Sequence, residues 1–246
     1  MKPVVVIPAR MASSRLPGKP LADILGEPMI VHVWRRAMEA AIGPVFVACA
    51  EAEIAEVVDQ VGGKAVLTDP ALASGSDRVH AALEMLDPDG RFDLVINPQG
   101  DTPTMAPALL HDVLKPLADP AVDIATLATR IREPEKMVDP NIVKVALEPH
   151  PNNPTVGKAL YFSRLTIPSG DGHYYHHEGI YAFRRASLRK FVSLPPAGLE
   201  QTERLEQLRA LVAGMRIDVA LIDAVPWGVN TPSDLERARE LMASRR

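Results

Sequence analysis

The chain has 246 residues, a formal net charge of −4 and a hydrophobic fraction of 47%, so it can bury a substantial core and lacks the broad basic surface of a general nucleic-acid binder. Its single cysteine excludes an internal disulfide and is typical of a reducing compartment, so we expect a cytoplasmic protein. No apolar run has the length of a signal peptide or a membrane-spanning helix, and we expect neither secretion nor a membrane partner.

Short apolar runs rich in β-branched residues alternate with amphipathic segments in the first half of the chain. Buried strands are predicted at residues 4–7, 45–49, 64–68 and 93–97. Helices are predicted at about residues 29–41, 51–61 and 77–86. This alternation is typical of a parallel sheet covered by helices on both faces. We therefore predict an α/β fold with a Rossmann-like, doubly wound, mostly parallel sheet.

The pattern loosens after about residue 120, where the sequence predicts a strand-rich inserted lobe. Strands are predicted at residues 122–131 and 141–147 with no clear helix between them, followed by a turn-rich excursion at 148–157. The remaining predicted elements are a strand at 177–183, a long helix at about 200–213, a strand at 217–222 and a last helix that Thr231 can cap.

The loop after the first predicted strand, PARMASSRLPGKP, carries three cations and no acidic residue. It lies beyond the carboxyl end of a strand, where open α/β sheets bind their ligands. The donors that it offers to a phosphate are Arg10, Ser13, Ser14, Arg15 and Lys19. The loop matches neither a Walker A motif nor a dinucleotide fingerprint. A solvated connection is the alternative, but the clustered charge favours a site for a small anionic ligand.

A second candidate is Asp101 in the sequence INPQGDTP, which follows another predicted strand. Nucleotidyl transfer needs Mg²⁺, which prefers carboxylate and phosphate oxygens as ligands. Aspartate is also common in turns, so a purely structural role is the alternative.

The stretch RMASSRLPGKPL resembles the signature of the sugar-activating cytidylyltransferases, and most closely that of the 3-deoxy-manno-octulosonate (Kdo) cytidylyltransferases. Further segments resemble the family in order along the chain: SGSDR at 74–78, QGD at 99–101, ALYFSR at 159–164, HEGIYAFR at 177–184 and ERLEQLR at 203–209. The resemblance implies one nucleotidyltransferase domain over residues 1–246. It implies that residues 1–120 mainly bind CTP and that residues 121–246 mainly serve sugar binding and dimerisation.

The resemblance also implies Mg²⁺-dependent transfer of CMP from CTP to Kdo, giving pyrophosphate and the CMP-Kdo used for lipopolysaccharide, by a homodimer. The implied catalytic residues are Asp101, Lys19 and Arg10. The implied nucleotide-binding residues are Arg10, Ser13, Arg15, Lys19, Ser74, Gly75 and Arg78. The implied sugar-binding residues are Gln99, Arg164, His177, Tyr181, Glu206 and Gln207, with Arg164 facing the sugar carboxylate. The implied metal ligands are Asp101 and Asn230.

Three places depart from the family pattern. Asn230 in GVNTPSDL replaces an aspartate, which removes a charge from the implied metal site and leaves Asp234 as a candidate replacement. Cys49 and Ala50 replace a polar pair after the second predicted strand. Glu178 follows His177 where relatives have a small or apolar residue.

These departures keep two alternatives open. In the first alternative, the chain is a cytidylyltransferase for a different acceptor, a 2-keto-3-deoxy sugar acid with an amino group. Glu178 would then recognise the amine of that acceptor. In the second alternative, Asn230 weakens the metal site, and the chain is a catalytically weak relative that binds CTP or a partner and acts as a regulatory protein.

Overall fold

A computed structural model describes residues 1–13, 15–223 and 228–244 of the chain, so Ser14 of the basic loop lies outside the described residues. The chain divides into two compact parts. We call Met1–Leu110 with Pro226–Arg246 unit 1, and His111–Val225 unit 2.

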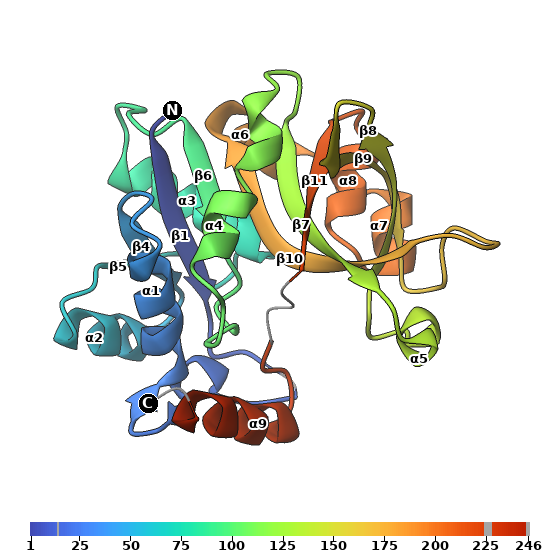
Figure 1. The fold of residues 1–246 in the computed structure, drawn as a ribbon. Coiled ribbons are helices and arrows are strands. Elements are labelled where there is room, and N and C mark those ends of the chain that lie inside the picture. Colours follow the sequence, from blue (N-terminus) through green and yellow to red (C-terminus); the bar gives the residue numbers. More distant parts are fainter. Residues whose placement is uncertain (14, 224–227, 245–246) are drawn as a thin grey trace. The chain divides into compact units, whose positions relative to one another are not determined.

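Unit 1 is built on a parallel sheet with the strand order β5-β4-β1-β6 (Figure 1). Its strands are β1 (Pro3–Ala9), β4 (Val45–Cys49), β5 (Ala65–Leu67) and β6 (Leu94–Asn97). The central strand β1 pairs with β4 on one side and with β6 on the other, and its residues Val4 to Ile7 are fully buried. A continuous apolar run of this kind is what a strand needs when helices cover both faces of its sheet.

The helices of unit 1 agree with the sequence prediction within one or two residues. They are α1 (Met29–Glu39), α2 (Ala52–Gln60) and α3 (Gly75–Leu86). A short helix, α4 (Ala108–Asp112), follows β6 and contains the point in the chain where unit 1 ends and unit 2 begins. Before α1, the chain forms the short 3-10 helix η1 (Lys19–Leu21) and a small hairpin of β2 (Asp23–Ile24) and β3 (Glu27–Pro28).

The last helix, α9 (Pro232–Ala243), belongs to unit 1 and begins as the sequence predicts. The Thr231 hydroxyl accepts a hydrogen bond from the Asp234 amide, and the Asp234 carboxylate accepts one from the Thr231 amide, which completes a capping box. One side of α9 packs into a small apolar cluster through Leu235 and Ala238. The cluster ties the end of the chain to the segment that follows the basic loop.

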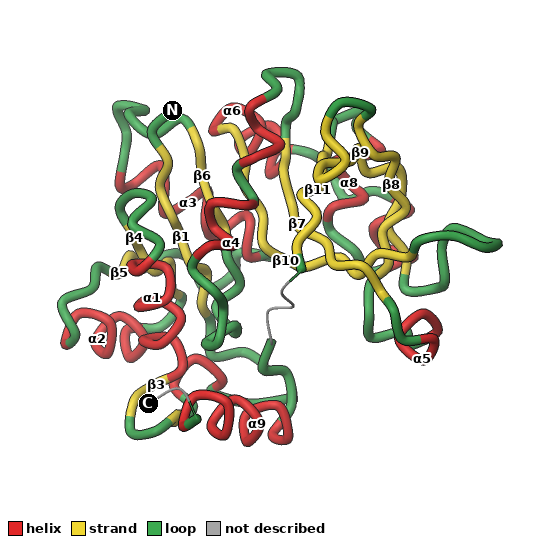
Figure 2. The backbone as a smooth tube through the Cα atoms, in the orientation of Figure 1, coloured by secondary structure: helices red, strands yellow, loops and turns green. Residues whose placement is uncertain are grey.

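Unit 2 contains a mixed sheet with the strand order β10-β7-β11-β9-β8, and Figure 2 shows how much of this unit is strand. Its strands are β7 (Ile124–Ile131), β8 (Lys144–His150), β9 (Asn153–Ser163), β10 (Tyr174–Arg184) and β11 (Ile217–Ile222). Strand β11 runs parallel to β7, whereas β10 pairs with β7, β9 with β11, and β8 with β9 in antiparallel fashion. The predicted strand-rich lobe is therefore present. Its helices are η2 (Lys115–Ala118), α5 (Pro134–Val138), α6 (Arg185–Ser193), α7 (Gly198–Glu203) and α8 (Gln207–Val212).

Two local predictions in unit 2 are wrong. Residues 148–157 form the tip of the β8–β9 hairpin instead of an irregular excursion, and α5 lies between β7 and β8, where no helix was predicted. The hairpin accommodates Pro149 beside a register shift, one of the places where a sheet tolerates proline.

The predicted long helix at 200–213 is also wrong, because the chain breaks it into α7 and α8. Arg204 adopts a left-handed conformation with φ of 55°, and Leu205 turns into the core. The two short helices remain tied by the ion pair between Glu200 and Arg209, whose nitrogen and oxygen lie 2.6 Å apart. Gln207 therefore begins α8 as a buried residue, and it does not lie on the wet face of one long helix.

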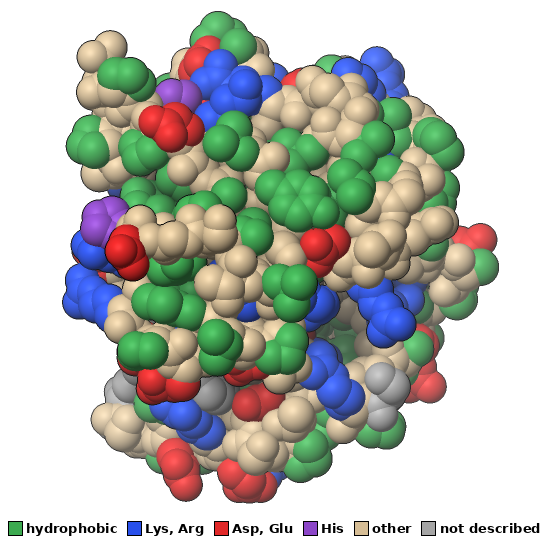
Figure 3. Space-filling view, turned by 90° about the vertical axis from the view of Figure 1, so that its right-hand side faces the viewer, with side chains coloured by type: hydrophobic (Ala, Val, Ile, Leu, Met, Phe, Trp, Pro, Cys, Tyr) green, Lys and Arg blue, Asp and Glu red, His purple; other side chains and the backbone are tan. Residues whose placement is uncertain are grey.

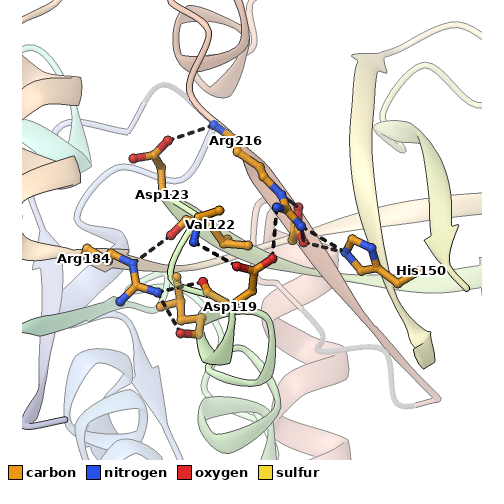
Figure 4. A network of polar contacts seen from close by, with 9 residues as sticks. Asp119, Val122, Asp123, His150, Arg184 and Arg216 are labelled. Carbon is orange, nitrogen blue, oxygen red and sulfur yellow. Dashed lines mark hydrogen bonds and ion pairs between the residues drawn. The ribbon is translucent and has the colours of Figure 1, made fainter. Parts of the chain in front are cut away.

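A polar network fastens the ends of β7 and β11 in unit 2 (Figure 4). Arg216 forms ion pairs with Asp119 at 3.0 Å and with the buried Asp218 at 2.9 Å, and the His150 imidazole lies 2.7 Å from the Asp218 carboxylate. Arg184 donates to the backbone carbonyls of Leu117, Asp119 and Val122. Asp218 is thus a compensated buried charge, which gives this network a structural role.

No helix in the described ranges is long and apolar enough to cross a membrane.

Candidate active site

A cavity of about 380 Å³ lies at the carboxyl end of β1 in unit 1. The residues of the predicted site that line it are Arg10, Ser13, Arg15, Lys19, Ser74, Gly75, Arg78, Gln99 and Asp101. All seven predicted nucleotide-binding residues are among them, so segments that are far apart in the sequence meet at one edge of the parallel sheet. The volume is within the usual range for small-molecule sites.

Glycines let these segments approach β1 closely. A Cβ atom on Gly100 would lie 2.5 Å from the carbonyl oxygen of Pro8, and one on Gly75 would lie 3.3 Å from the Pro8 ring. Gly18 has φ of 68°, a left-handed conformation that turns the basic loop into η1. Gly100 is a residue that sequence reasoning did not single out, although its place between Gln99 and Asp101 was the available signal.

Beside the wall of the cavity, a cation meets several oxygen atoms. The Lys19 ammonium donates to the Asp101 carboxylate at 2.6 Å, to the Val229 carbonyl at 3.1 Å and to the Asn230 side-chain oxygen at 3.4 Å. Arg15 donates to the same oxygen of Asn230 at 3.2 Å. The Val229 amide donates to the Asp101 carbonyl at 2.8 Å, which fixes the C-terminal segment against the QGD turn. Hard oxygen ligands therefore already surround a positive charge here.

Asp234 does not replace the missing carboxylate in this arrangement. Its carboxylate accepts hydrogen bonds from the amides of Asn230 and Thr231 at 2.9 and 2.8 Å, so it serves the cap of α9. Within the described ranges, no three His, Cys, Asp or Glu side chains form a group that could hold a metal ion. Side-chain amide and backbone oxygens are the further ligands available near Asp101.

Arg78 brings a buried cation to the wall of the cavity. It is 2% exposed, and its Nη1 donates to the Thr68 hydroxyl at 2.5 Å and to the Asp69 carbonyl at 3.4 Å. Burial lowers the pKa of Arg78, an effect that the nearby Glu51 carboxylate opposes. Its Nη2 is buried and has no hydrogen-bond partner in the part of the chain that the structure describes. A buried donor without a partner is costly, so this atom is suited to bind an acceptor on a ligand.

Two other residues that the sequence analysis singled out in unit 1, Ser74 and Cys49, are part of the local structure. The Ser74 hydroxyl accepts from the Asp77 amide at 3.2 Å and donates to the Asp77 carboxylate at 2.9 Å, which caps α3. Cys49 ends β4 as a buried thiol, and burial raises its pKa to about 11. The thiol therefore stays protonated at neutral pH.

The predicted sugar-binding residues, apart from Gln99, all lie in unit 2. His177 is buried in β10, with its Nε2 3.0 Å from the Thr126 hydroxyl and its ring 4.9 Å from that of Phe162. Burial lowers the pKa of His177 to about 3, so the imidazole is neutral. The Tyr181 ring lies 5.5 Å from that of His177, and burial raises the pKa of its phenol.

The other members of this set lie at the ends of strands and helices. Arg164 follows β9 and donates from Nη1 to the Pro140 carbonyl at 3.2 Å. Glu206 immediately precedes α8. Gln207 is 6% exposed, and its Nε2 has no hydrogen-bond partner among the residues that the structure describes.

Glu178, the acidic departure beside His177, is engaged with its neighbours. It is 5% exposed, accepts a hydrogen bond from the Thr129 hydroxyl at 3.1 Å and lies 3.1 Å from Nδ1 of His176. These partners compensate the buried carboxylate, so the structure does not favour a role for Glu178 in recognising an amine.

Known proteins resemble the chain over its full length. A family described as cytidylyltransferase matches residues 4–217. The 3-deoxy-manno-octulosonate cytidylyltransferases of Rhodopseudomonas palustris and Paramagnetospirillum magneticum are 60% and 58% identical over 242 residues, and each alignment covers 98% of both chains.

Solved structures agree with these relatives. The structure of a CMP:2-keto-3-deoxy-manno-octonic acid synthetase complexed with CTP is 40% identical, covers 100% of both chains and has a TM-score of 0.91. A cytidylyltransferase from Leptospira borgpetersenii shares the fold at 14% identity, with a TM-score of 0.62 over 99% of this chain and 87% of its own. The α/β nucleotidyltransferase fold, the cavity at the carboxyl edge of its parallel sheet and this full-length similarity agree: the chain belongs to the 3-deoxy-manno-octulosonate cytidylyltransferase family.

Proposed function

We propose that the protein transfers CMP from CTP to Kdo and releases pyrophosphate. The anomeric hydroxyl of the sugar attacks the α-phosphorus of CTP, the bond to the pyrophosphate oxygen breaks, and the hydroxyl proton leaves to solvent. The observation that carries the proposal is the meeting of Arg10, Arg15 and Lys19 with Asp101 in one cavity. Electrostatic stabilisation and positioning account for most of the catalysis of phosphoryl-type transfers, and this cavity is equipped for both.

The cations of unit 1 have separate tasks in this reaction. Arg10, Arg15 and Lys19 offset the charge of the triphosphate and of the departing pyrophosphate. The Nη2 of Arg78, which has no partner within the described ranges, donates to an acceptor on the nucleotide. Arg78 is held by Thr68, so this donor is fixed before the ligand arrives.

Asp101 and Asn230 fit the Mg²⁺ ion that the reaction needs. Their oxygens already face one cation, the Lys19 ammonium, and an aspartate with an amide oxygen is a common pair of ligands for a hard divalent ion. Bound Mg²⁺ would neutralise phosphate charge and lower the pKa of the attacking hydroxyl. Asn230 brings no charge, so we expect this protein to need more Mg²⁺ than a variant with aspartate at that position.

The groups of unit 2 support recognition of a sugar acid. Arg164 pairs with the acceptor carboxylate. The neutral imidazole of His177 contacts the sugar hydroxyls, and so do the side chains of Tyr181, Glu206 and Gln207. The Nε2 of Gln207 has no hydrogen-bond partner among the described residues, so it is a donor available for such a contact. The engagement of Glu178 with Thr129 and His176 favours Kdo over an amino-substituted acceptor.

We also propose that the protein is a cytoplasmic homodimer that needs neither nucleic acid nor a membrane. Unit 2 exposes large apolar side chains, among them Val138, Leu160 and Leu165, with exposed fractions of 72%, 56% and 73%. Figure 3 shows hydrophobic side chains of this kind on one face, between charged ones. Exposed apolar surface supports an interface between subunits. Analytical ultracentrifugation at several concentrations tests the dimer, and a monomer at micromolar concentration would refute it.

The experiment that tests the function measures pyrophosphate release with CTP and Kdo across a Mg²⁺ titration, for the protein and for Asn230→Asp. We expect release by both proteins, with half-maximal rate at lower Mg²⁺ for the variant. Release by the variant alone would identify a relative silenced at its metal site. If both are silent with Kdo, release with an amino-substituted acid would support the second acceptor, and tight CTP binding without release would support a regulatory role.

A further inference from the structure

Lys144 is a buried lysine whose ammonium group is bound by the backbone. It opens β8, is 0% exposed, and burial lowers its pKa. Its Nζ donates to the carbonyls of Asp139, Ile142 and Arg164 at 2.8, 2.6 and 2.5 Å. An ammonium has three donors, so these carbonyls use all of them and favour its charged form.

These bonds hold Arg164 in place from two directions. Lys144 binds the carbonyl of Arg164, while the Arg164 amide donates to the Glu203 carboxylate at 3.3 Å. Lys144 also binds both ends of the loop 139–142, and Pro140 in that loop accepts the bond from the Arg164 guanidinium at 3.2 Å. The buried ammonium therefore fixes the main chain of Arg164 together with the loop that its side chain contacts.

Packing alone does not explain a lysine at this position. An ammonium group is costly to bury, and methionine would fill a similar volume without that cost. The charge at residue 144 contributes a geometry that an apolar side chain would not maintain, namely three carbonyls held around one point.

We propose that Lys144 is a positioning residue for the sugar acid: it fixes Arg164 and the loop 139–142 so that the Arg164 guanidinium meets the acceptor carboxylate. The inference rests on the proposed function, in which Arg164 binds that carboxylate. Arg164 would bind the acceptor carboxylate in the ground state and in the transition state alike, so its displacement should weaken acceptor binding and raise the KM for the acceptor with little change in kcat.

The test compares Lys144→Met with Lys158→Met, a control in which an exposed lysine of the neighbouring strand β9 changes in the same way. We expect Lys144→Met to raise the KM for Kdo about 10- to 100-fold. The KM for CTP and the kcat should change much less, and Lys158→Met should match the parent protein. A merely structural role would instead lower the amount of active protein and leave both KM values unchanged.

A double-mutant cycle decides whether Lys144 acts through Arg164. In an Arg164→Met background, Lys144→Met should cause no further rise in the KM for Kdo, because the group that it positions is gone. Independent, multiplicative effects of the two substitutions would overturn the proposal.

A second variant covers the case in which Lys144→Met does not fold. Lys144→Arg keeps a buried cation, but its planar fork cannot reproduce three bonds from one nitrogen, so we expect a smaller rise in the same KM. The parent protein is assayed first. If it releases no pyrophosphate from CTP and Kdo, the proposed function fails; if it is active and neither Lys144 variant changes the KM for Kdo, the positioning role alone fails.

Discussion

The two units present their candidate residues in different ways. In unit 1, Lys19, Asp101 and Asn230 come from distant parts of the chain and meet around one point, and Arg78 has a donor available to a ligand. In unit 2, His177 and Arg164 are individually bound to their own scaffold. In unit 1, charged side chains are concentrated and one donor is available to a ligand. In unit 2, the polar side chains are held in fixed orientations by their neighbours in the sheet.

The sheets explain this difference. Every strand pair in the sheet of unit 1 is parallel, so the loops at the carboxyl ends gather on one edge and bring their residues together. In unit 2 most neighbouring strands are antiparallel, and His177 lies on β10 within the sheet, opposite Ala128 of β7. A side chain within a sheet must have its polar atoms satisfied locally, which makes it a rigid contact and not a mobile charge. Four substitutions test this comparison.

The largest effect is expected for Asp101→Asn in unit 1. The substitution removes the carboxylate of the charged cluster, so pyrophosphate release should fall by at least about 10³-fold while the fold is kept. Steady-state kinetics at saturating CTP and Kdo measure the loss, and Asp89→Asn, at an exposed residue of the same unit, is the control. A loss below tenfold would show that the chemistry of unit 1 does not depend on this carboxylate.

A smaller and more selective effect is expected for Arg164→Met in unit 2. Loss of the charged hydrogen bond that we propose between Arg164 and the acceptor should raise the KM for Kdo by about 10²-fold and leave the KM for CTP within about twofold. Arg130→Met, at an exposed residue of β7, is the matched control. An equal rise in both KM values would contradict the division of tasks between the two units.

His177 should make the stability of the protein depend on pH. Its ordinary pKa of 6.5 applies to the unfolded chain, whereas the folded pKa is about 3, so below pH 6.5 the unfolded state binds a proton that the folded state does not. The free energy of unfolding should therefore fall as the pH falls, with a contribution from this residue that steepens from about 0.7 kcal/mol per pH unit at pH 6.5 to about 1.4 kcal/mol per pH unit near pH 5. Urea denaturation between about pH 6.5 and pH 5 measures the slope.

The slope should become smaller in His177→Gln and stay unchanged in His173→Gln, whose histidine is exposed. An unchanged slope in His177→Gln would mean that the imidazole is not held neutral by its surroundings.

The smallest effect is expected for Thr231→Ala at the start of α9. It removes one half of the capping box, so the free energy of unfolding should fall by about 1 kcal/mol, a Tm decrease of about 2–4 °C. Differential scanning calorimetry measures the change, with Ser169→Ala at an exposed loop residue as control. A Tm equal to that of the control would contradict the cap.

Local patterns predicted much of unit 1. The apolar runs identified β1, β4, β5 and β6, the amphipathic segments identified α1 to α3, and Thr231 with Pro232 marked the start of α9. Strong periodicity and side-chain caps act within a few residues, which is why such features are readable from the sequence. The basic loop and Asp101 were readable for the same reason, since each directly follows a predicted strand.

Tertiary structure decided what depends on contacts between distant residues. The predicted long helix ends at Arg204, and the proline-containing segment near residue 150 forms a hairpin. Glycine is required at position 100 because the carbonyl of Pro8 lies so close. The hydrogen bond from Lys144 to the Arg164 carbonyl, 20 positions away in the sequence, is another such contact. The sequence by itself determined the family resemblance and the elements of the parallel half, because these are local in the chain. Burial, charge compensation and side-chain orientation depended on neighbours that only folding brings together.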